Sequence, residues 1–131
     1  EAWVLSTHKD LKVWKECIEL AKKVYLCTEG FPASEAYNLT SQMRRAAVSM
    51  ASNIAEGAAR QSSKEFVQFL YIALGSGSEL DTQLLLAREL GMIDKQCYES
   101  ISSEITSIQR MIQGLIRFKS QRVRTARDSV N

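Results

Sequence analysis

The chain has very little proline, histidine and glycine. Its 131 residues include one proline, one histidine and six glycines. Proline and glycine are the residues that most often interrupt helices, so their scarcity favours long helical stretches. No apolar run is long enough to cross a bilayer, and no secretory signal is visible. We therefore expect one all-helical domain located in the cytoplasm.

Cysteine occurs three times, which is an odd number, and never in a CxxC spacing. Cys17, Cys27 and Cys97 each fall among the apolar positions of a predicted helix. A free thiol at such a position behaves as a small hydrophobic side chain. We expect all three to be reduced thiols, in keeping with a cytoplasmic setting. No metal site and no cofactor are expected.

The single histidine excludes several kinds of active site. His8 lies near the N-terminus, so the paired Glu-x-x-His ligands of a di-iron bundle cannot form. A helical ribonuclease with an Arg-x4-His pair would need arginine where Trp3 stands. No second histidine exists to serve a serine or cysteine nucleophile. No strand precedes the Gly75-Ser-Gly77-Ser run, so it is not a dinucleotide loop. We therefore expect no enzyme and no catalytic residue.

Four helices are predicted from the spacing of apolar residues. Their predicted bounds are about residues 9–29, 40–59, 62–91 and 94–119. The expected N-terminal caps are the Thr7–Asp10 box, Thr40, the Ser62–Glu65 box and Asp94.

Short connections between long helices make neighbours antiparallel, so the predicted fold is an up-down-up-down four-helix bundle. The last helix supports it, because its apolar residues alternate at three and four places as along a bundle seam. These residues are Tyr98, Ile101, Ile105, Ile108, Ile112 and Leu115. The predicted organisation is an N-terminal extension (1–8), the bundle (9–119) and a basic flexible tail (120–131), which we expect to fray or be disordered.

Polar and small residues interrupt the apolar face of the second predicted helix. Asn53, Glu56 and Gly57 stand where a core would normally carry leucine or alanine. Small residues allow a neighbouring helix to come close, and the glycines at 75 and 77 are expected to do the same. Asn53 and Glu56 form either a ligand site at a subunit junction or a buried polar network, and we favour the network. Its predicted members are Arg44, Arg45, Asn53, Glu56, Ser76 and Glu79, together with Gln83.

The first half of the third predicted helix is apolar almost all the way round. A helix without a wet face must be covered on more than one side. In a domain of this size, we expect the extra cover to come from another copy of the chain. The predicted interface residues are Phe66, Phe69, Tyr71 and Ile72.

Positive charge is concentrated at the C-terminal end. From Arg110 onward six basic residues face Asp128, a net charge of +5, so the rest carries −3 of the total +2. A basic tail on a mildly acidic body suggests an anionic partner, although such tails also serve only to keep a chain in solution. Arg60 and Lys64 border one predicted loop and can face the same anion. The candidate nucleic-acid contacts are Arg60, Lys64, Arg117, Lys119, Arg122, Arg124 and Arg127.

The segment 39–60, followed by 66–76 and 79–88, resembles the bacterial four-helix bundle family of 23S rRNA intervening-sequence proteins. The most specific part is Asn53-Ile-Ala-Glu-Gly57, after Arg44-Arg45-Ala-Ala-Val-Ser. Many relatives carry proline where this chain has Ala51. That family includes the accessory variability determinant of diversity-generating retroelements. The resemblance implies a cytosolic bundle that forms a ring-shaped homopentamer, does non-catalytic work and has RNA or a reverse-transcriptase partner in some members.

The resulting hypothesis is a non-enzymatic, homo-oligomeric helical scaffold that binds RNA or a protein–RNA assembly through basic residues. The alternative is a structural or regulatory protein–protein adaptor that does not bind nucleic acid. No membrane association is expected for either.

Overall fold

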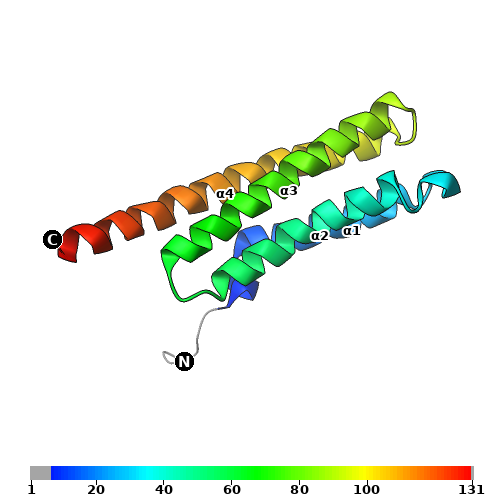
Figure 1. The fold of residues 1–131 in the computed structure, drawn as a ribbon. Coiled ribbons are helices and arrows are strands. Elements are labelled where there is room, and N and C mark those ends of the chain that lie inside the picture. Colours follow the sequence, from blue (N-terminus) through cyan, green and yellow to red (C-terminus); the bar gives the residue numbers. More distant parts are fainter. Residues whose placement is uncertain (1–6, 131) are drawn as a thin grey trace.

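The computed structural model describes residues 7–130, and within that range it contains helices and no strand. The bounds are α1 (Lys12–Thr28), α2 (Leu39–Ala58), α3 (Ser63–Glu89) and α4 (Lys95–Val130), with short 3-10 turns at His8–Asp10 and Ala33–Glu35. The prediction of an all-α, up-down-up-down four-helix bundle is confirmed (Figure 1). None of the helices in this range is long and apolar enough to cross a membrane.

Each helix packs against its two neighbours, with α2 lying against α1 and α3, and α4 closing the bundle against α3 and α1. Cross-helix bonds record the antiparallel register of α4. Lys23 near the end of α1 donates to Ser100 near the start of α4, at 2.7 Å. Gln109 farther along α4 donates to the backbone oxygen of Leu74 in α3, at 3.0 Å.

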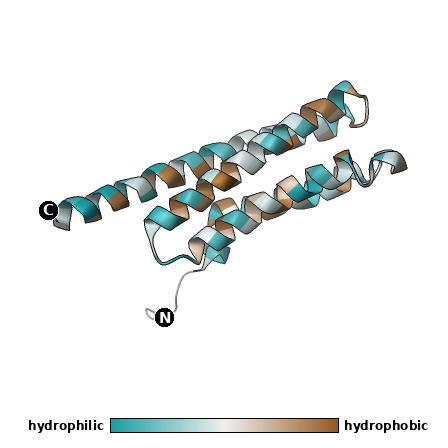
Figure 2. Cartoon of the chain, in the orientation of Figure 1, coloured by the Kyte–Doolittle hydropathy of each residue, from teal (hydrophilic) through white to brown (hydrophobic). Residues whose placement is uncertain are grey.

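The predicted seam of α4 forms one side of the core. Ile101, Ile105, Ile108 and Ile112 are all buried, as the three-four spacing indicates. Tyr98 and Leu115, at the two ends of the predicted seam, are half-buried and pack against the core. Figure 2 shows the hydrophobic and hydrophilic residues alternating along α4. The periodicity therefore located this face of the bundle correctly.

Two of the predicted helix caps are confirmed. The Ser62 hydroxyl accepts a hydrogen bond from the Glu65 amide at 3.2 Å, which caps α3. A carboxylate oxygen of Asp94 accepts one from the Cys97 amide at 2.8 Å, at the start of α4. Gly91 follows α3 with a φ of +73°, the left-handed conformation that ends helices at glycine.

The other two predicted caps are wrong. The α2 helix begins at Leu39, so Thr40 lies inside its first turn and is buried. The cap position belongs to Asn38, whose side chain caps no amide. The Thr7 hydroxyl accepts from the Lys9 amide at 3.2 Å and so belongs to the first 3-10 turn. That turn delays the start of α1 to Lys12.

The expected flexible tail is instead a continuation of α4 as far as Val130. No glycine or proline follows Gly114, and Gln, Arg, Lys and Ala all favour helix, so nothing ends the helix at residue 119. The guanidinium of Arg122 also lies 5.3 Å from the ring of Phe118, one turn earlier. Asn131 and residues 1–6 of the predicted N-terminal extension lie outside the described residues.

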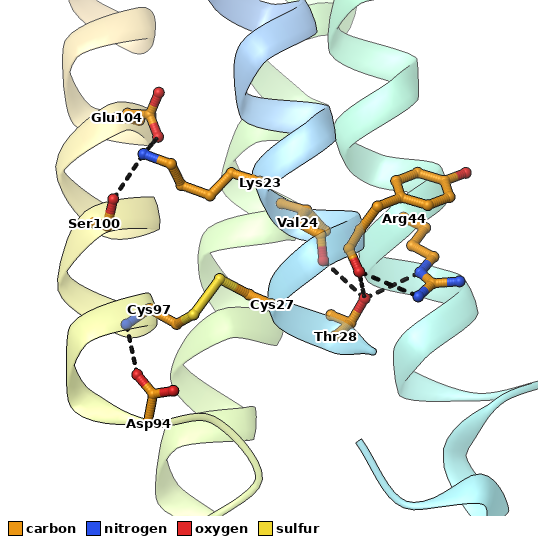
Figure 3. Close-up of a disulfide and its surroundings, with 10 residues drawn as sticks. Lys23, Val24, Cys27, Thr28, Arg44, Asp94, Cys97, Ser100 and Glu104 are labelled. Atoms are coloured by element: carbon orange, nitrogen blue, oxygen red, sulfur yellow. Dashed lines mark hydrogen bonds and ion pairs between the residues drawn. A yellow bond between two sulfur atoms is a disulfide. The ribbon is translucent and has the colours of Figure 1, made fainter. Parts of the chain in front are cut away.

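The expectation of three free thiols is wrong, because Cys27 and Cys97 form a disulfide (Figure 3). They are 70 residues apart in sequence, and their Cα atoms are 6.1 Å apart. The antiparallel pairing of α1 and α4 brings the end of one helix beside the start of the other. In the chain-entropy model, closing a loop of this length stabilises the fold by about 4 kcal/mol. Disulfides are typical of oxidising compartments, so the expected cytoplasmic location stays a prediction.

Gly57, Gly75 and Gly77 were expected to allow close packing between helices, and the structure bears this out for Gly57 and Gly77. A Cβ atom on Gly57 would stand 2.7 Å from the Cβ of Phe69 and 2.8 Å from the ring of Phe66. A Cβ on Gly77 would overlap the side-chain amide of Gln109. Nothing lies within 4 Å of a Cβ built on Gly75. Gly75 is therefore not required by a neighbouring helix.

The glycines at 57 and 75 offer a matched pair of alanine substitutions. We expect Gly75→Ala to raise the free energy of unfolding by about 1 kcal/mol, because alanine favours helix and meets no neighbour. Gly57→Ala should lower it by about 1–3 kcal/mol, because α2 and α3 must move apart. Urea unfolding of both variants measures the difference. Equal stabilisation by the two substitutions would contradict the close packing at Gly57.

Counting reactive thiols tests the disulfide. Burial, with a smaller contribution from Glu16, raises the pKa of the Cys17 thiol to about 12, so the native protein should not react with a thiol reagent near pH 8. Unfolding without reductant should expose only Cys17, and reduction should expose Cys27 and Cys97 as well. Cys17→Ala is the control and should show no thiol before reduction. Three reactive thiols in unreduced, unfolded protein would contradict the disulfide.

Candidate nucleic-acid interface

The cations predicted from separate segments of the chain come together at one end of the bundle. This basic end lies where α2 finishes, α3 begins and the last turns of α4 run past both (Figure 1). The ammonium group of Lys119 lies 5.3 Å from the centroid of the Phe66 ring, in the first turn of α3. The guanidinium of Arg60 lies 4.7 Å from the ring of Phe69. These contacts link the α2–α3 connection to α4.

A shallow groove between α3 and α4 runs through the basic end. It is lined by Lys64, Val67, Gln68, Tyr71, Ser120, Val123 and Arg124. The lining contains two cations, two valines and an aromatic ring, and it contains no carboxylate. Tyr71 is 59% exposed there. Tyr71 was predicted as an interface residue and not as a neighbour of these cations, because it comes from another helix. Tyr71 could be placed near the cations of α4 only once the register of α3 against α4 was known.

The seven cations predicted to contact nucleic acid differ in whether another side chain of the protein already engages them. Arg60 pairs with Glu56 at 3.2 Å, and both side chains are about half exposed, so the pair is weak. The Lys119 and Arg122 side chains lie over the exposed ring of Phe118. The remaining four are exposed and have no hydrogen bond or ion pair within residues 7–130: Lys64, Arg117, Arg124 and Arg127.

The end of α4 stands clear of the other helices. From Gln121 to Ser129 every residue is exposed except Val123, which is half-buried. The helix therefore forms an arm that reaches beyond the other helices (Figure 1), and its arginines are exposed. No carboxylate lines the groove at this end, and Glu56 is paired with Arg60. The arrangement is that of a cationic surface open to a large anionic partner.

The predicted polar network is smaller than expected. The amide nitrogen of Asn53 donates to the backbone oxygen of Ser49 at 2.8 Å and to its hydroxyl at 2.9 Å. The Ser76 hydroxyl donates to the Ser49 hydroxyl oxygen at 3.0 Å and so joins α3 to α2. Ser49 was not among the predicted members. The bond from Ser76 joins two helices, so the spacing of residues within α2 does not predict it.

Of the predicted members only Asn53 and Ser76 belong to this network, and the three others on α2 lie outside it. Glu56 is exposed and pairs with Arg60 one turn later in α2. Arg44 lies twelve residues before Glu56, about 18 Å along the helix axis, so the two cannot meet. Its guanidinium instead donates to the Thr28 hydroxyl at 3.0 Å and to the Tyr25 backbone oxygen at 3.3 Å (Figure 3). Arg45 is exposed and has no partner among the described residues.

The remaining two predicted members are bonded to each other, since the carboxylate of Glu79 accepts a hydrogen bond from the side-chain amide of Gln83 at 3.2 Å. Both residues lie on α3, so this bond does not connect to Ser76 through any contact found in the described helices. The favoured reading of Asn53 as a structural residue agrees with its bonds, since its amide is used within α2 and through Ser49 toward α3.

The four residues predicted for the oligomer interface differ in how exposed they are in the single chain. Phe66 is 7% exposed and belongs to the core of its own chain, so its assignment to the interface is wrong. Phe69 is half-buried. Tyr71 and Ile72 are 59% and 51% exposed, and Leu85 and Leu86 farther along α3 are also exposed. The outer face of α3 therefore retains large apolar side chains that a single chain does not cover.

Within the described chain no cluster of histidine, cysteine and acidic residues can hold a metal ion. The histidine, His8, packs edge-on against Trp14 with ring centroids 4.9 Å apart. His8 begins the 3-10 turn before α1 and does not line the groove between α3 and α4.

Residues 9–114 match the family model described as the 23S rRNA-intervening sequence protein. The fold is similar to a crystal structure from Bacteroides thetaiotaomicron, described as a protein with unknown function from the S23 ribosomal protein family. The TM-score is 0.74 and the identity 25%, over 80% of this chain and 95% of that one. No curated protein matches the chain. The bundle, with a family match over most of its length, shows that the chain belongs to the 23S rRNA-intervening sequence protein family.

Proposed function

We propose that this protein is a non-enzymatic helical scaffold that self-associates, as a pentamer, and binds RNA or a protein–RNA assembly through its basic end. The observation that supports this most is the convergence of cations from α2, α3 and α4 on one end of the bundle. The sequence separates Arg60 and Lys64 from the α4 arginines by half the chain, and the fold places them together.

The geometry of the basic end suits a polyanion better than a small ligand. The arm of α4 carries Arg124 and Arg127, which form no ion pair with residues 7–130, and it stands in solvent. Cations spaced along an exposed helix can contact successive phosphates, and the released counterions favour binding. The exposed rings of Tyr71 and Phe118 add surfaces on which unpaired bases can stack. Recognition of this kind depends little on base sequence.

Self-association would strengthen such binding. Ile72 and Leu86 lie fourteen residues apart on α3, so both fall on one stripe of its outer face. Burying that stripe against another copy would remove apolar area from water. Several copies would then present their α4 arms together, and each additional contact to one RNA would be effectively intramolecular. The name of the family, which refers to 23S rRNA, agrees with an RNA partner.

The alternative function is a protein–protein adaptor in the same cytoplasmic setting, with a reverse-transcriptase-like protein as one candidate partner. A second exposed apolar surface favours it. Ile18, Ala21, Tyr25 and Leu26 line a shallow hollow on α1, with Lys22 at its edge. A protein partner could use this surface without any contact to the basic end, so the two functions differ in their dependence on salt and on the arginines of α4.

Charge reversal in the α4 arm tests RNA binding. We expect Arg124→Glu with Arg127→Glu to weaken binding of a structured RNA by at least tenfold at about 0.1 M salt, because two phosphate contacts are lost. The dependence of log affinity on log salt should become shallower by about two. The matched control is Lys22→Glu with Lys95→Glu, which makes the same charge change far from the basic end and should change affinity less than about threefold. Affinity that ignores both salt and the α4 variant would leave the adaptor function standing.

Light scattering after size exclusion tests self-association. We expect a mass near five times the 14.7 kDa of one chain. Ile72→Arg with Leu86→Arg should lower the mass to that of one chain, because two charges would be buried at the interface. Leu26→Arg places the same charge on the exposed face of α1 and should leave the assembly intact. A wild-type chain that elutes as a monomer at micromolar concentration would contradict the proposal.

A further inference from the structure

A second cationic groove lies at the opposite end of the bundle from the basic end. It runs along the outward face of the start of α2, beside the end of α1. Its lining residues are Tyr25, Ala36, Tyr37, Thr40, Ser41, Arg44, Arg45, Val48 and Ser49. Two of them are arginines and none is acidic. The proposed RNA contacts do not involve this groove.

Arg44 is held in a fixed position at the edge of this groove. Its Nε donates to the Thr28 hydroxyl at 3.0 Å, and its Nη2 donates to the Tyr25 backbone oxygen at 3.3 Å (Figure 3). The Thr28 hydroxyl is itself anchored, since it donates to the Val24 backbone oxygen at 2.7 Å. The guanidinium also lies 4.6 Å from the centroid of the Tyr25 ring. These contacts use only part of its N–H donors, so a pre-positioned cation with free donors remains.

Two further side chains in the groove can donate hydrogen bonds for which the described chain supplies no acceptor. Arg45 is exposed and has no hydrogen bond or ion pair with residues 7–130. Thr40 is 7% exposed, and its hydroxyl is buried without a partner. An unpaired buried hydroxyl is unfavourable, so a ligand that accepts from it would remove that cost. The nearest carboxylate in sequence, Glu35, is already engaged by the Asn38 side-chain amide at 3.3 Å.

The N-terminus of α2 and the two tyrosine rings of the groove indicate which chemical groups a ligand here should carry. Thr40 and Ser41 lie in the first turn of α2, whose N-terminus has no side-chain cap and carries a partial positive charge. Two guanidinium groups and two hydroxyls offer more donors than a carboxylate needs, and they match the oxygens of a phosphoryl group. Tyr25 is partly exposed, Tyr37 is fully exposed and Val48 is exposed beside them. A flat ring attached to the phosphate would have aromatic surface to contact.

We propose that this groove binds the phosphate group of a small ligand that also carries a flat ring, as a nucleoside monophosphate does. Arg44 and Arg45 bind the phosphate oxygens, and the Thr40 hydroxyl donates to one of them. The tyrosine rings contact the flat part of the ligand. This site is separate from the basic end and does not depend on RNA binding.

Titration of the whole protein, followed by two-dimensional amide NMR, tests the proposal with three probes: adenosine monophosphate, adenosine and inorganic phosphate. We expect adenosine monophosphate to shift the amides of Thr40, Ser41 and Arg45 and to bind at least about tenfold more tightly than inorganic phosphate. Adenosine alone should bind more weakly still. Equal affinity for inorganic phosphate and adenosine monophosphate would overturn the role of the rings. Absence of shifts in the first turns of α2 with every probe would overturn the site.

Three variants separate binding from folding. Arg45→Ala should weaken the binding of adenosine monophosphate by about tenfold or more, with no change in the unfolding midpoint, because Arg45 is exposed and makes no hydrogen bond or ion pair with residues 7–130. Thr40→Val keeps the shape but removes the hydroxyl, so it should weaken the ligand several-fold without lowering the unfolding midpoint. Arg127→Ala removes the same charge at the basic end and should leave the affinity unchanged. If Arg127→Ala weakens the ligand as much as Arg45→Ala, the binding is general charge attraction and the proposal fails.

Discussion

The close packing of α2 against its neighbours positions everything else in this molecule. Ala46, Ala47 and Gly57 are buried on its inner faces and allow α1 and α3 to approach. That approach fixes the register of α2 and α3, so Arg60 and Lys64 share one end of the bundle. The antiparallel seam of α4 then brings its arginines to the same end. The basic end is therefore a consequence of helix register, since no single segment contains it.

The two ends of the bundle offer anions different environments. The basic end is open, its charges stand on an exposed helix, and salt screens them strongly. The groove at the start of α2 instead has an arginine held by Thr28 and Tyr25. The disulfide of Cys27 immediately precedes Thr28 and ties that end of α1 to α4. A covalent link beside the anchor keeps the arginine in place, which suits a small ligand better than a flexible polymer.

The spacing of apolar residues was enough to predict the bundle, because a pattern such as that of the isoleucines in α4 reports burial directly. The seven cations were also named from the sequence, and their contact with nucleic acid stays a prediction. What the sequence did not reveal depends on contacts between helices. The Cys27–Cys97 disulfide, the place of Tyr71 beside Arg124 and the bond between Ser49 and Ser76 all join distant segments. Phe66 was misplaced because an apolar helix does not show which of its sides meets its own chain.

Lysine acetylation of the whole protein, read by mass spectrometry with and without a structured RNA, tests the central claim that RNA contacts the basic end. The chain has lysines at that end and far from it, so each sample contains its own control. The account predicts that RNA protects Lys64 and Lys119 and leaves Lys22 and Lys95 as reactive as before. Protection of Lys22 and Lys95 to the same extent, or protection of no lysine at saturating RNA, would contradict it.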